Sequence, residues 1–171
     1  MNAIARAMMQ AYSRFAAISS GATSPFLLLV RLYWGWQFMQ TGWGKLHNLE
    51  HVTQFFTSLG IPAPGPTAVF VGCVELFGGL LLAVGLVSRL TGLMLTVNML
   101  VAYITADHEA LFSILSNPGK FYGADPYTFL FAALLVLIFG PGYFALDTWF
   151  GRRFDIWAEK SEPGMRRRHA A

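Results

Sequence analysis

The sequence predicts an all-α membrane protein, a four-transmembrane-helix antiparallel bundle with short interfacial helices. Hydrophobic residues make up 55% of its 171 residues and charged residues only 12%, whereas a soluble domain carries about 25% charged residues. Four long apolar segments also follow one another along the chain, and crossing a bilayer takes about 20 apolar residues in a helix. Because hydrocarbon offers the backbone no hydrogen-bond partner, these segments are expected to be helices.

Residues 1–24 are expected to form an N-terminal cytoplasmic amphipathic segment. Its apolar residues recur at helical spacing with two arginines between them: Ile4, Met8, Tyr12 and Phe15, with Arg6 and Arg14. This pattern is typical of a basic helix that lies on the inner surface of a membrane. A disordered, alanine-rich tail is the alternative interpretation.

The membrane domain is expected to cover residues 25–150. Its predicted spans are residues 25–44, 67–87, 90–106 and 126–146. Only two or three residues around Ser88 and Arg89 separate the second span from the third, so these two spans should form an antiparallel hairpin. Residues 151–171 are expected to be a basic cytoplasmic tail.

The two longer loops are predicted to carry short interfacial helices. After the first span, five apolar residues share one helical face: Leu49, Val52, Phe55, Phe56 and Leu59. Three prolines within "GIPAPGP" should end that helix. Between the third and fourth spans, an amphipathic turn begins near Asp107 and breaks at Asn117-Pro118-Gly119. Asp125 then precedes Pro126 as an N-cap precedes a first-turn proline.

Basic residues predict the orientation. An even number of spans places both termini on one side, and nine basic residues fall there: Arg6, Arg14, Arg89, Arg152, Arg153, Lys160, Arg166, Arg167 and Arg168. Only Lys45 and Lys120 fall on the other side. Because cytoplasmic loops carry the excess of lysine and arginine, both termini of this multi-pass chain are expected in the cytoplasm. The net charge of +3 is therefore a topology signal, and nucleic acid is not expected as a partner.

The residue inventory excludes several kinds of redox site. Cys73 is the only cysteine, so the chain cannot form an internal dithiol–disulfide pair. No histidine lies inside a predicted span, so an intramembrane haem is not expected. His47 and His51 are four residues apart and should lie on the same side as His108, which makes them weak candidates for a metal site. An ordinary solvated loop is the alternative, and no metal is predicted.

Glu75 is the only charged residue in the apolar stretch from residue 69 to residue 87. Its helical neighbours, three and four residues away, are Val71, Gly72, Gly78 and Gly79. Small residues mark the face where another helix approaches closely, so Glu75 should point into the bundle. A charged carboxylate there costs about 2.5–3.5 kcal/mol on insertion scales. The side chain is therefore expected to be paired or protonated.

Three other polar residues complete a predicted intramembrane network. Arg31 lies in the first span, Asn98 in the third and Asp147 at the inner end of the fourth. Their depths in the membrane, counted along the predicted spans, favour an Arg31–Asp147 ion pair and place Asn98 beside Glu75. A three-way network of Arg31, Glu75 and Asp147 stays open. Such groups either specify how the helices pack or mark a proton, quinone or ligand site.

The stretches "LVRLYWGWQFMQTGWGKL", "ELFGGLLLAVGLVSRL" and "FGPGYFALD" resemble the DoxX family of small bacterial membrane proteins. The resemblance covers residues 25–150, with these matching positions: Arg31, Gly42, Lys45, Glu75, Gly78, Gly79, Gly85, Arg89, Gly140, Pro141, Gly142 and Asp147. It implies a four-helix bundle in the bacterial cytoplasmic (inner) membrane. Related DoxD-type chains are subunits of a thiosulfate:quinone oxidoreductase, and some DoxX proteins are associated with membrane oxidoreductase complexes in oxidative-stress defence.

The resemblance and the polar network together predict the membrane subunit of a redox-linked complex that binds a quinone. Arg31 and Glu75 would supply charge or a proton. Trp34, Trp36, Trp43 and Lys45 are the candidate ligand contacts, although tryptophans near a span end more often anchor a helix at the interface. A redox protein or a second copy of the chain is the expected partner. The alternatives are a non-catalytic assembly or chaperone-like membrane protein, and a small-molecule permease.

Overall fold

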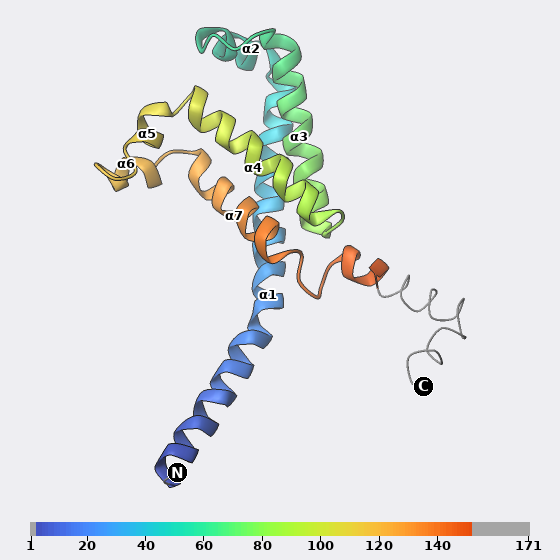
Figure 1. Ribbon diagram of the computed structural model, residues 1–171. Coiled ribbons are helices and arrows are strands. Elements are labelled where there is room, and N and C mark those ends of the chain that lie inside the picture. The colour runs from blue at the N-terminus through green and yellow to red at the C-terminus, as the bar shows by residue number, and fades with distance from the viewer. Residues whose placement is uncertain (1–2, 152–171) are drawn as a thin grey trace, which may run out of the picture.

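The protein is all-helical in the part of the chain that the structure describes. A computed structural model describes residues 3–151, with side chains from residue 8 onward, and is drawn in Figure 1. Its helices are α1 (Ala3–His47), α2 (Leu49–Ser58), α3 (Pro64–Val84), α4 (Ser88–Thr105), α5 (His108–Phe112), α6 (Pro118–Tyr122) and α7 (Pro126–Phe139). Residues 146–151 form a further helical turn, and no strand occurs among residues 3–151. The all-α prediction is confirmed.

Among these helices, α1 and α3 are long and apolar enough to cross a membrane. The 21 residues of α3 correspond to about 30 Å of helix, which matches the hydrocarbon thickness of a bilayer. In contrast, α7 has 14 residues, or about 21 Å. It ends at Phe139 because Gly140 takes a positive φ of 76° and Pro141 follows. The predicted fourth span, residues 126–146, is therefore not one continuous helix.

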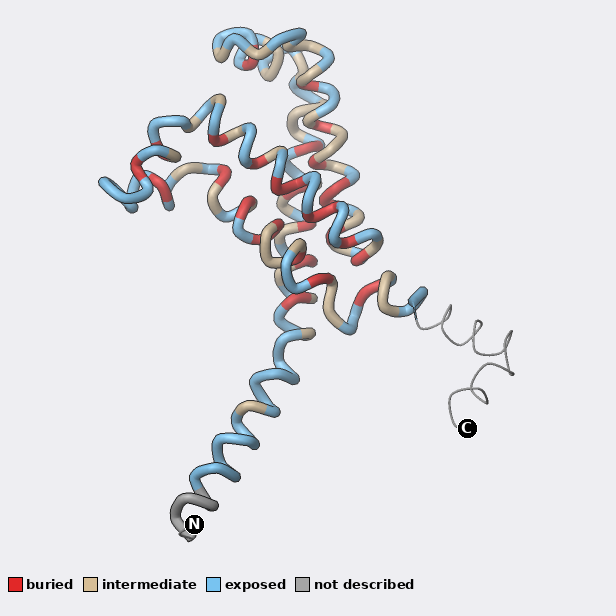
Figure 2. Tube along the Cα trace, viewed as in Figure 1, coloured by how far each residue is buried: buried red, intermediate tan, exposed pale blue. Residues whose placement is uncertain are grey.

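The first predicted segment and the first predicted span belong to one helix. α1 continues through Pro25 without a break. Its first half projects away from the other helices, and most side chains of residues 8–25 are exposed, as Figures 1 and 2 show. The predicted boundary at residue 24 is thus not an end of secondary structure. The predicted basic tail, residues 151–171, lies outside the described residues except for Gly151.

α1 and α3 approach each other through glycines. A Cβ on Gly35 would lie 2.7 Å from the backbone oxygen of Gly79, and a Cβ on Gly42 would lie 2.4 Å from the backbone nitrogen of Leu76. Only glycine permits backbones to come this close, as in small-residue contacts between membrane helices. The face of α3 that carries Gly72 and Gly79 is therefore covered by α1.

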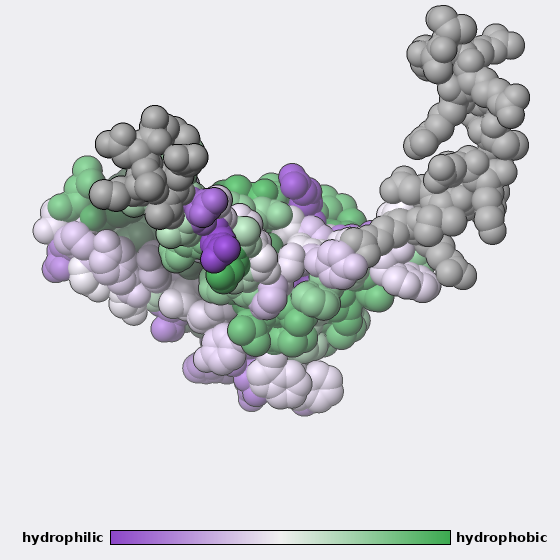
Figure 3. All heavy atoms as spheres, turned by 90° about the horizontal axis from the view of Figure 1, so that it is seen from below, coloured by the Kyte–Doolittle hydropathy of each residue, from purple (hydrophilic) through white to green (hydrophobic). Residues whose placement is uncertain are grey.

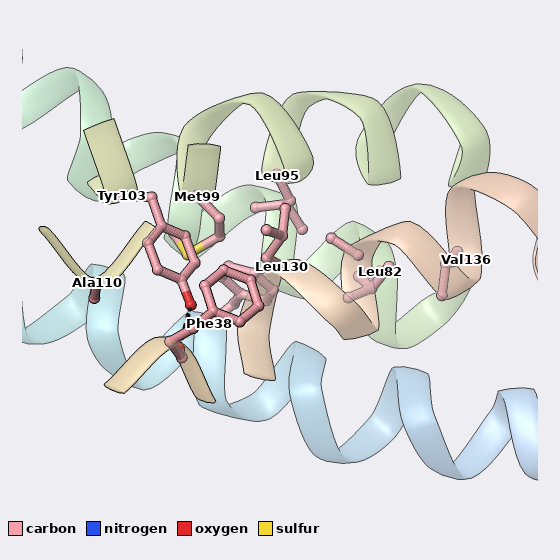
Figure 4. Close-up of a cluster of buried hydrophobic side chains, with 10 residues drawn as sticks. Phe38, Leu82, Leu95, Met99, Tyr103, Ala110, Leu130 and Val136 are labelled. Atoms are coloured by element: carbon pink, nitrogen blue, oxygen red, sulfur yellow. Dashed lines mark hydrogen bonds between the residues drawn. The ribbon is translucent and has the colours of Figure 1, made fainter. Parts of the chain in front are cut away.

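A second face of α3 meets α4, and α7 packs against α4 and α1. Gly78 of α3 lies against Leu95 of α4, and Gly92 of α4 lies against the α7 backbone near Ala133. Figure 4 shows the core that results, in which Phe38 and Leu82 meet residues of α4 and α7. The hydroxyl of Tyr103 in α4 donates to the carbonyl oxygen of Phe121 in α6 at 2.9 Å, which ties the α5–α6 segment to this core.

Large apolar side chains also cover the outside of the molecule. On α3 they include Phe70, Phe77, Leu80 and Val84, and the hydrophobic surface is visible as green patches in Figure 3. A monomer in water rarely exposes this much contiguous apolar surface. The exposed faces of α1, α3 and α4 are therefore suited to lipid contact.

Replacing Gly42 with alanine is expected to destabilise the α1–α3 pair. The new Cβ would meet backbone atoms of Gly72 and Leu76, which cannot rotate aside as a side chain could, and overpacking of this kind costs about 1–3 kcal/mol. Thermal unfolding in detergent should show a lower midpoint for Gly42→Ala.

Gly44→Ala is the matched control for that measurement. It lies in the same helix, and its Cβ would have no heavy atom within 4 Å. Both substitutions gain about 1 kcal/mol in helix propensity, so only the close approach distinguishes them. Equal unfolding midpoints for the two variants would contradict the close-packing argument.

Candidate functional site

A buried ion pair joins α1 to α3 near the end of the bundle that carries α2. Lys45 of α1 donates from Nζ to Oε2 of Glu75 in α3, and Asn98 of α4 donates from Nδ2 to Oε1 at 3.0 Å. The Glu75 side chain is only 2% exposed, so both carboxylate oxygens are satisfied inside the protein. Lys45, Glu75 and Asn98 are called the Glu75 cluster below.

The glycine contacts explain why these three residues meet. Gly42 brings α1 against Gly72 of α3. Lys45 is three residues beyond Gly42 and Glu75 is three residues beyond Gly72, so each falls on the contact face of its own helix. The expectation that Glu75 points into the bundle and needs a partner therefore agrees with this geometry. The sequence reasoning placed Asn98 beside Glu75 but missed Lys45 as its ionic partner.

A cavity of about 620 Å³ borders the Glu75 cluster. All three residues of the cluster line it, and the rest of its wall is mainly apolar, including Phe55, Phe56, Leu59, Val71, Met99 and Phe129. A few convergent polar groups in a mostly apolar hollow of this size are typical of a small-molecule site. Lys45 has three N–H donors and is partly exposed, so it can also donate to a molecule in the cavity.

A second polar cluster lies at the opposite end of the bundle. Arg31 is 0% exposed and donates from Nη2 to the carbonyl oxygen of Phe144. Its Nε and Nη1 have no hydrogen-bond partner within residues 3–151. Nη1 lies where a Cβ on Gly85 would be, so only glycine at position 85 leaves space for the guanidinium. Arg31 thus holds the segment after α7 against the turn between α3 and α4.

The predicted Arg31–Asp147 ion pair does not form: the ion pairs among residues 8–151 are Lys45–Glu75 and Lys120–Glu109. Both carboxylate oxygens of Asp147 cap α4 instead: Oδ1 accepts from the Val87 backbone at 2.6 Å and Oδ2 from the Ser88 backbone at 2.7 Å. First-turn N–H groups have no partner within their own helix, so a carboxylate satisfies them well. Glu75 belongs to the other cluster, and the three-way network is therefore wrong.

The predicted tryptophan contacts lie outside the cavity. Trp36 and Trp43 are exposed on α1, as expected for residues that face lipid or the interface. Trp34 packs edge-on against Phe129, with ring centroids 5.2 Å apart, and so stands behind the cavity wall. Lys45 is the one candidate contact that lines the cavity. The aromatic lining of the cavity comes from α2 and α7. The sequence signal that could have identified it was the apolar face predicted for α2.

The histidine candidates for a metal site are not brought together with enough ligands. His47 and His51 flank an open hollow of about 370 Å³ together with Glu50, and His47 Nδ1 is 3.0 Å from the carbonyl oxygen of Trp43. His108 begins α5. No group of three histidine, cysteine, aspartate or glutamate side chains suited to a metal was found among residues 3–151.

An exposed ion pair on the α5–α6 segment contrasts with the Glu75 cluster. Lys120 donates to Glu109 at 2.7 Å, and both side chains are largely solvent-accessible. The hydrogen bond and charge of Lys120, with His108 adding less, lower the pKa of Glu109 from its ordinary value. The resulting stabilisation is present above the ordinary pKa and is lost as the pH falls through the lowered one. It should be small at an exposed site.

Comparison with known proteins gives a family match and related sequences. The sequence model of the DoxX family matches residues 26–108, a range that contains the Glu75 cluster and Arg31. "Putative oxidoreductase CatD" of Bacillus subtilis (strain 168) is 31% identical over 120 residues, which cover 70% of this chain and 83% of that protein.

A second relative is "Uncharacterized membrane protein Rv3486" of Mycobacterium tuberculosis (strain ATCC 25618 / H37Rv). It is 27% identical over 141 residues, which cover 75% of this chain and 83% of that protein. No solved structure matches the chain. Together with the apolar helices, these relatives indicate a membrane location.

Lys45→Met is expected to destabilise the protein by about 3–5 kcal/mol, because it leaves the buried Glu75 carboxylate without its cation. The double variant Lys45→Met/Glu75→Leu removes both charges and should lose less than the sum of the two single losses. Unfolding in detergent followed by circular dichroism measures the coupling. Lys120→Met, which breaks the exposed pair, is the control and should leave stability nearly unchanged. Strictly additive losses at positions 45 and 75 would contradict the pairing.

Asp147→Ala is expected to cost about 1–2 kcal/mol, the usual effect of losing a helix cap. It leaves the N–H groups of Val87 and Ser88 without their acceptor. Asp125→Ala is the matched control: Asp125 stands at the N-cap position of α7 but makes no side-chain capping bond. The same unfolding measurement should therefore show a loss at position 147 and almost none at position 125. A reversed order would contradict the capping assignment.

Proposed function

The chain belongs to the DoxX family, and from this premise we propose that it binds a quinone in the cavity beside the Glu75 cluster, as the membrane subunit of a redox-linked complex. One observation carries the proposal: a mostly apolar cavity ends at an ion pair between the partly exposed Lys45 and the buried Glu75. An aromatic ring suits the wall of Phe55, Phe56 and Phe129. A ring carbonyl oxygen suits the free N–H donors of Lys45.

The Glu75 cluster can serve such a ligand in two ways. Lys45 donates a hydrogen bond to a carbonyl oxygen, and that bond strengthens as reduction puts negative charge on the oxygen. Glu75 keeps Lys45 charged and oriented, while Asn98 holds the second carboxylate oxygen. Reduction of a quinone to a hydroquinone takes two electrons and two protons. Lys45 Nζ can deliver one proton and then be reprotonated from water. Water delivers the second proton.

The two electrons would come from a partner protein that carries a reduced flavin or a dithiol. This chain has a single cysteine, Cys73, and cannot form a dithiol by itself. The name of the Bacillus subtilis relative contains "oxidoreductase", which favours a redox role for the complex. In this arrangement the chain supplies the quinone site and the partner supplies the donor.

We place the chain in the bacterial inner membrane as a multi-pass protein, with α1, α3 and α4 as spans and the shorter α7 as the fourth pass. Nine of the eleven basic residues outside the spans lie on the same side of the proposed spans as the two termini, which supports cytoplasmic termini. The Glu75 cluster and its cavity would then face the outer half of the bilayer. Pairing of two copies through the exposed first half of α1 is compatible with this placement.

A non-catalytic assembly role is the second candidate function. The observation in its favour is that Lys45, Glu75 and Asn98 already satisfy one another, so the cluster can fix helix packing without a ligand. A partner protein would then recognise the folded bundle, and the cavity would have no quinone.

Quinone binding to the purified protein tests the first proposal against the second. In nanodiscs, the wild-type protein should bind a short-chain ubiquinone in a saturable way, and gently extracted protein should contain quinone. Losing a charged hydrogen bond costs about 1.5–3 kcal/mol, so Lys45→Met should weaken binding by about tenfold or more. Glu75→Gln should also weaken it, whereas the surface control Lys120→Met should not.

Circular dichroism must show that each variant is folded. A wild-type protein that binds no quinone, or a Lys45→Met variant that is folded and binds normally, would contradict the quinone proposal. A stoichiometric co-purifying protein in the absence of quinone would favour the assembly role.

A further inference from the structure

We propose that the cavity opens sideways into the bilayer between α2 and α4, so that its ligand is a lipid-borne quinone whose chain leaves through this opening. The inference rests on the proposed quinone site and specifies the ligand class and its route. Its basis is the arrangement of polar and apolar groups around the cavity.

The cavity wall is polar at its inner end and apolar at part of its rim. The Glu75 cluster supplies the polar groups at one end. At the rim, Phe55 of α2 and Val101 of α4 both line the cavity and remain about half exposed. A ligand with a polar head and an apolar chain therefore matches this wall when the head lies at Lys45 and the chain passes between Phe55 and Val101.

No helix packing closes the space between α2 and α4. α2 packs mainly against α3, whereas α4 packs against α7, α3 and α5. In Figure 1, α2 sits across the end of α3, and the end of α4 lies apart from it. Side chains from both helices line the cavity, and two of them, Phe55 and Val101, are also exposed at the surface, which favours an opening between α2 and α4.

The surface beside this opening is apolar. Val97, Val101 and Ile104 form an exposed face of α4 and are 51%, 50% and 60% accessible. Residues at this spacing share one side of a helix. An exposed apolar face on a membrane protein is a lipid-contacting face, so the opening is continuous with the surface that lipid covers.

Depth along the helices agrees with a lipid-side entrance. Glu75 lies about 16 Å along α3 from its first residue, and Val101 lies about 6 Å from the last residue of α4, at about 1.5 Å per residue. Both depths fall within a hydrocarbon layer of about 30 Å. The cavity therefore lies at a depth that lipid chains occupy.

A competing route leads from water across the polar part of the rim. Thr67, Thr105, Asp107 and Asp125 also line the cavity. A water-soluble ring without a chain could enter there. We favour the bilayer route because the cavity is too small to enclose a long isoprenoid chain together with its head, and the apolar rim offers that chain an exit.

Binding to protein in nanodiscs, with each quinone expressed as its mole fraction in lipid, tests the route. A ubiquinone with a long chain should bind at least about tenfold tighter than menadione, which has none. Val101→Trp should weaken binding of the long-chain quinone by about tenfold by narrowing the opening, and should weaken binding of menadione clearly less. Val97→Trp is the matched control: it adds the same bulk to the same face of α4, equally exposed, but does not line the cavity.

A long-chain quinone with a diazirine at its chain end gives a second readout on the unaltered protein. It should label α2 and the exposed face of α4, in residues 49–59 and 97–104. Equal affinity of the two quinones, equal effects of Val101→Trp and Val97→Trp, or labelling confined to residues 107–125 would overturn the lipid-side route but leave the quinone site intact. If neither quinone binds, the proposed function itself fails.

Discussion

The close contact between α1 and α3 is the constraint on which the rest of the structure depends. Gly35 and Gly42 on one helix meet Gly79 and Gly72 on the other, and any larger residue would hold the backbones apart. At this separation Lys45 reaches the Glu75 carboxylate. The contact therefore decides the chemistry at one end of the bundle as well as the packing along it.

At the other end of the bundle, a sharp turn between α3 and α4 determines which residues come into contact. Gly85 has a positive φ of 72° and Val87 one of 49°, which turns the chain sharply between α3 and α4. Asp147 satisfies the first N–H groups of α4, and its own N–H donates to the carbonyl oxygen of Gly85 at 3.0 Å. Arg31 then holds the segment after α7 through Phe144. The two polar clusters thus hold the helix bundle at two levels, each joining segments that are distant in sequence.

Residue patterns predicted the helices well because composition and apolar length depend on local sequence. They also predicted that Glu75 is buried, since glycines three and four residues away mark a contact face.

The Lys45 partner was missed because depth was counted along single straight helices, which placed Lys45 at a surface. Its long side chain instead reaches inward along a close helix contact. The capping role of Asp147 was invisible for a similar reason, because it depends on a turn sixty residues away. The aromatic residues around the cavity were assigned to the wrong helix, since tryptophan at a span end gives a stronger sequence signal than the phenylalanines of α2.

The position of the Glu75 cluster argues for a role beyond fixing how the helices pack. Buried ion pairs are often no more stabilising than apolar residues of the same shape, so stability alone is a weak reason for a lysine and a glutamate in the interior of a membrane protein. Arg31 illustrates the structural case: it is fully enclosed, and neither Arg31 nor Asp147 lines the cavity beside Glu75. Lys45 differs because it is partly exposed and lines a hollow whose other walls are mainly apolar. A charge held at the end of such a hollow strongly favours an oxygen atom placed beside it, since water does not compete freely there. That asymmetry between the two clusters favours the α2 end of the bundle as the functional one.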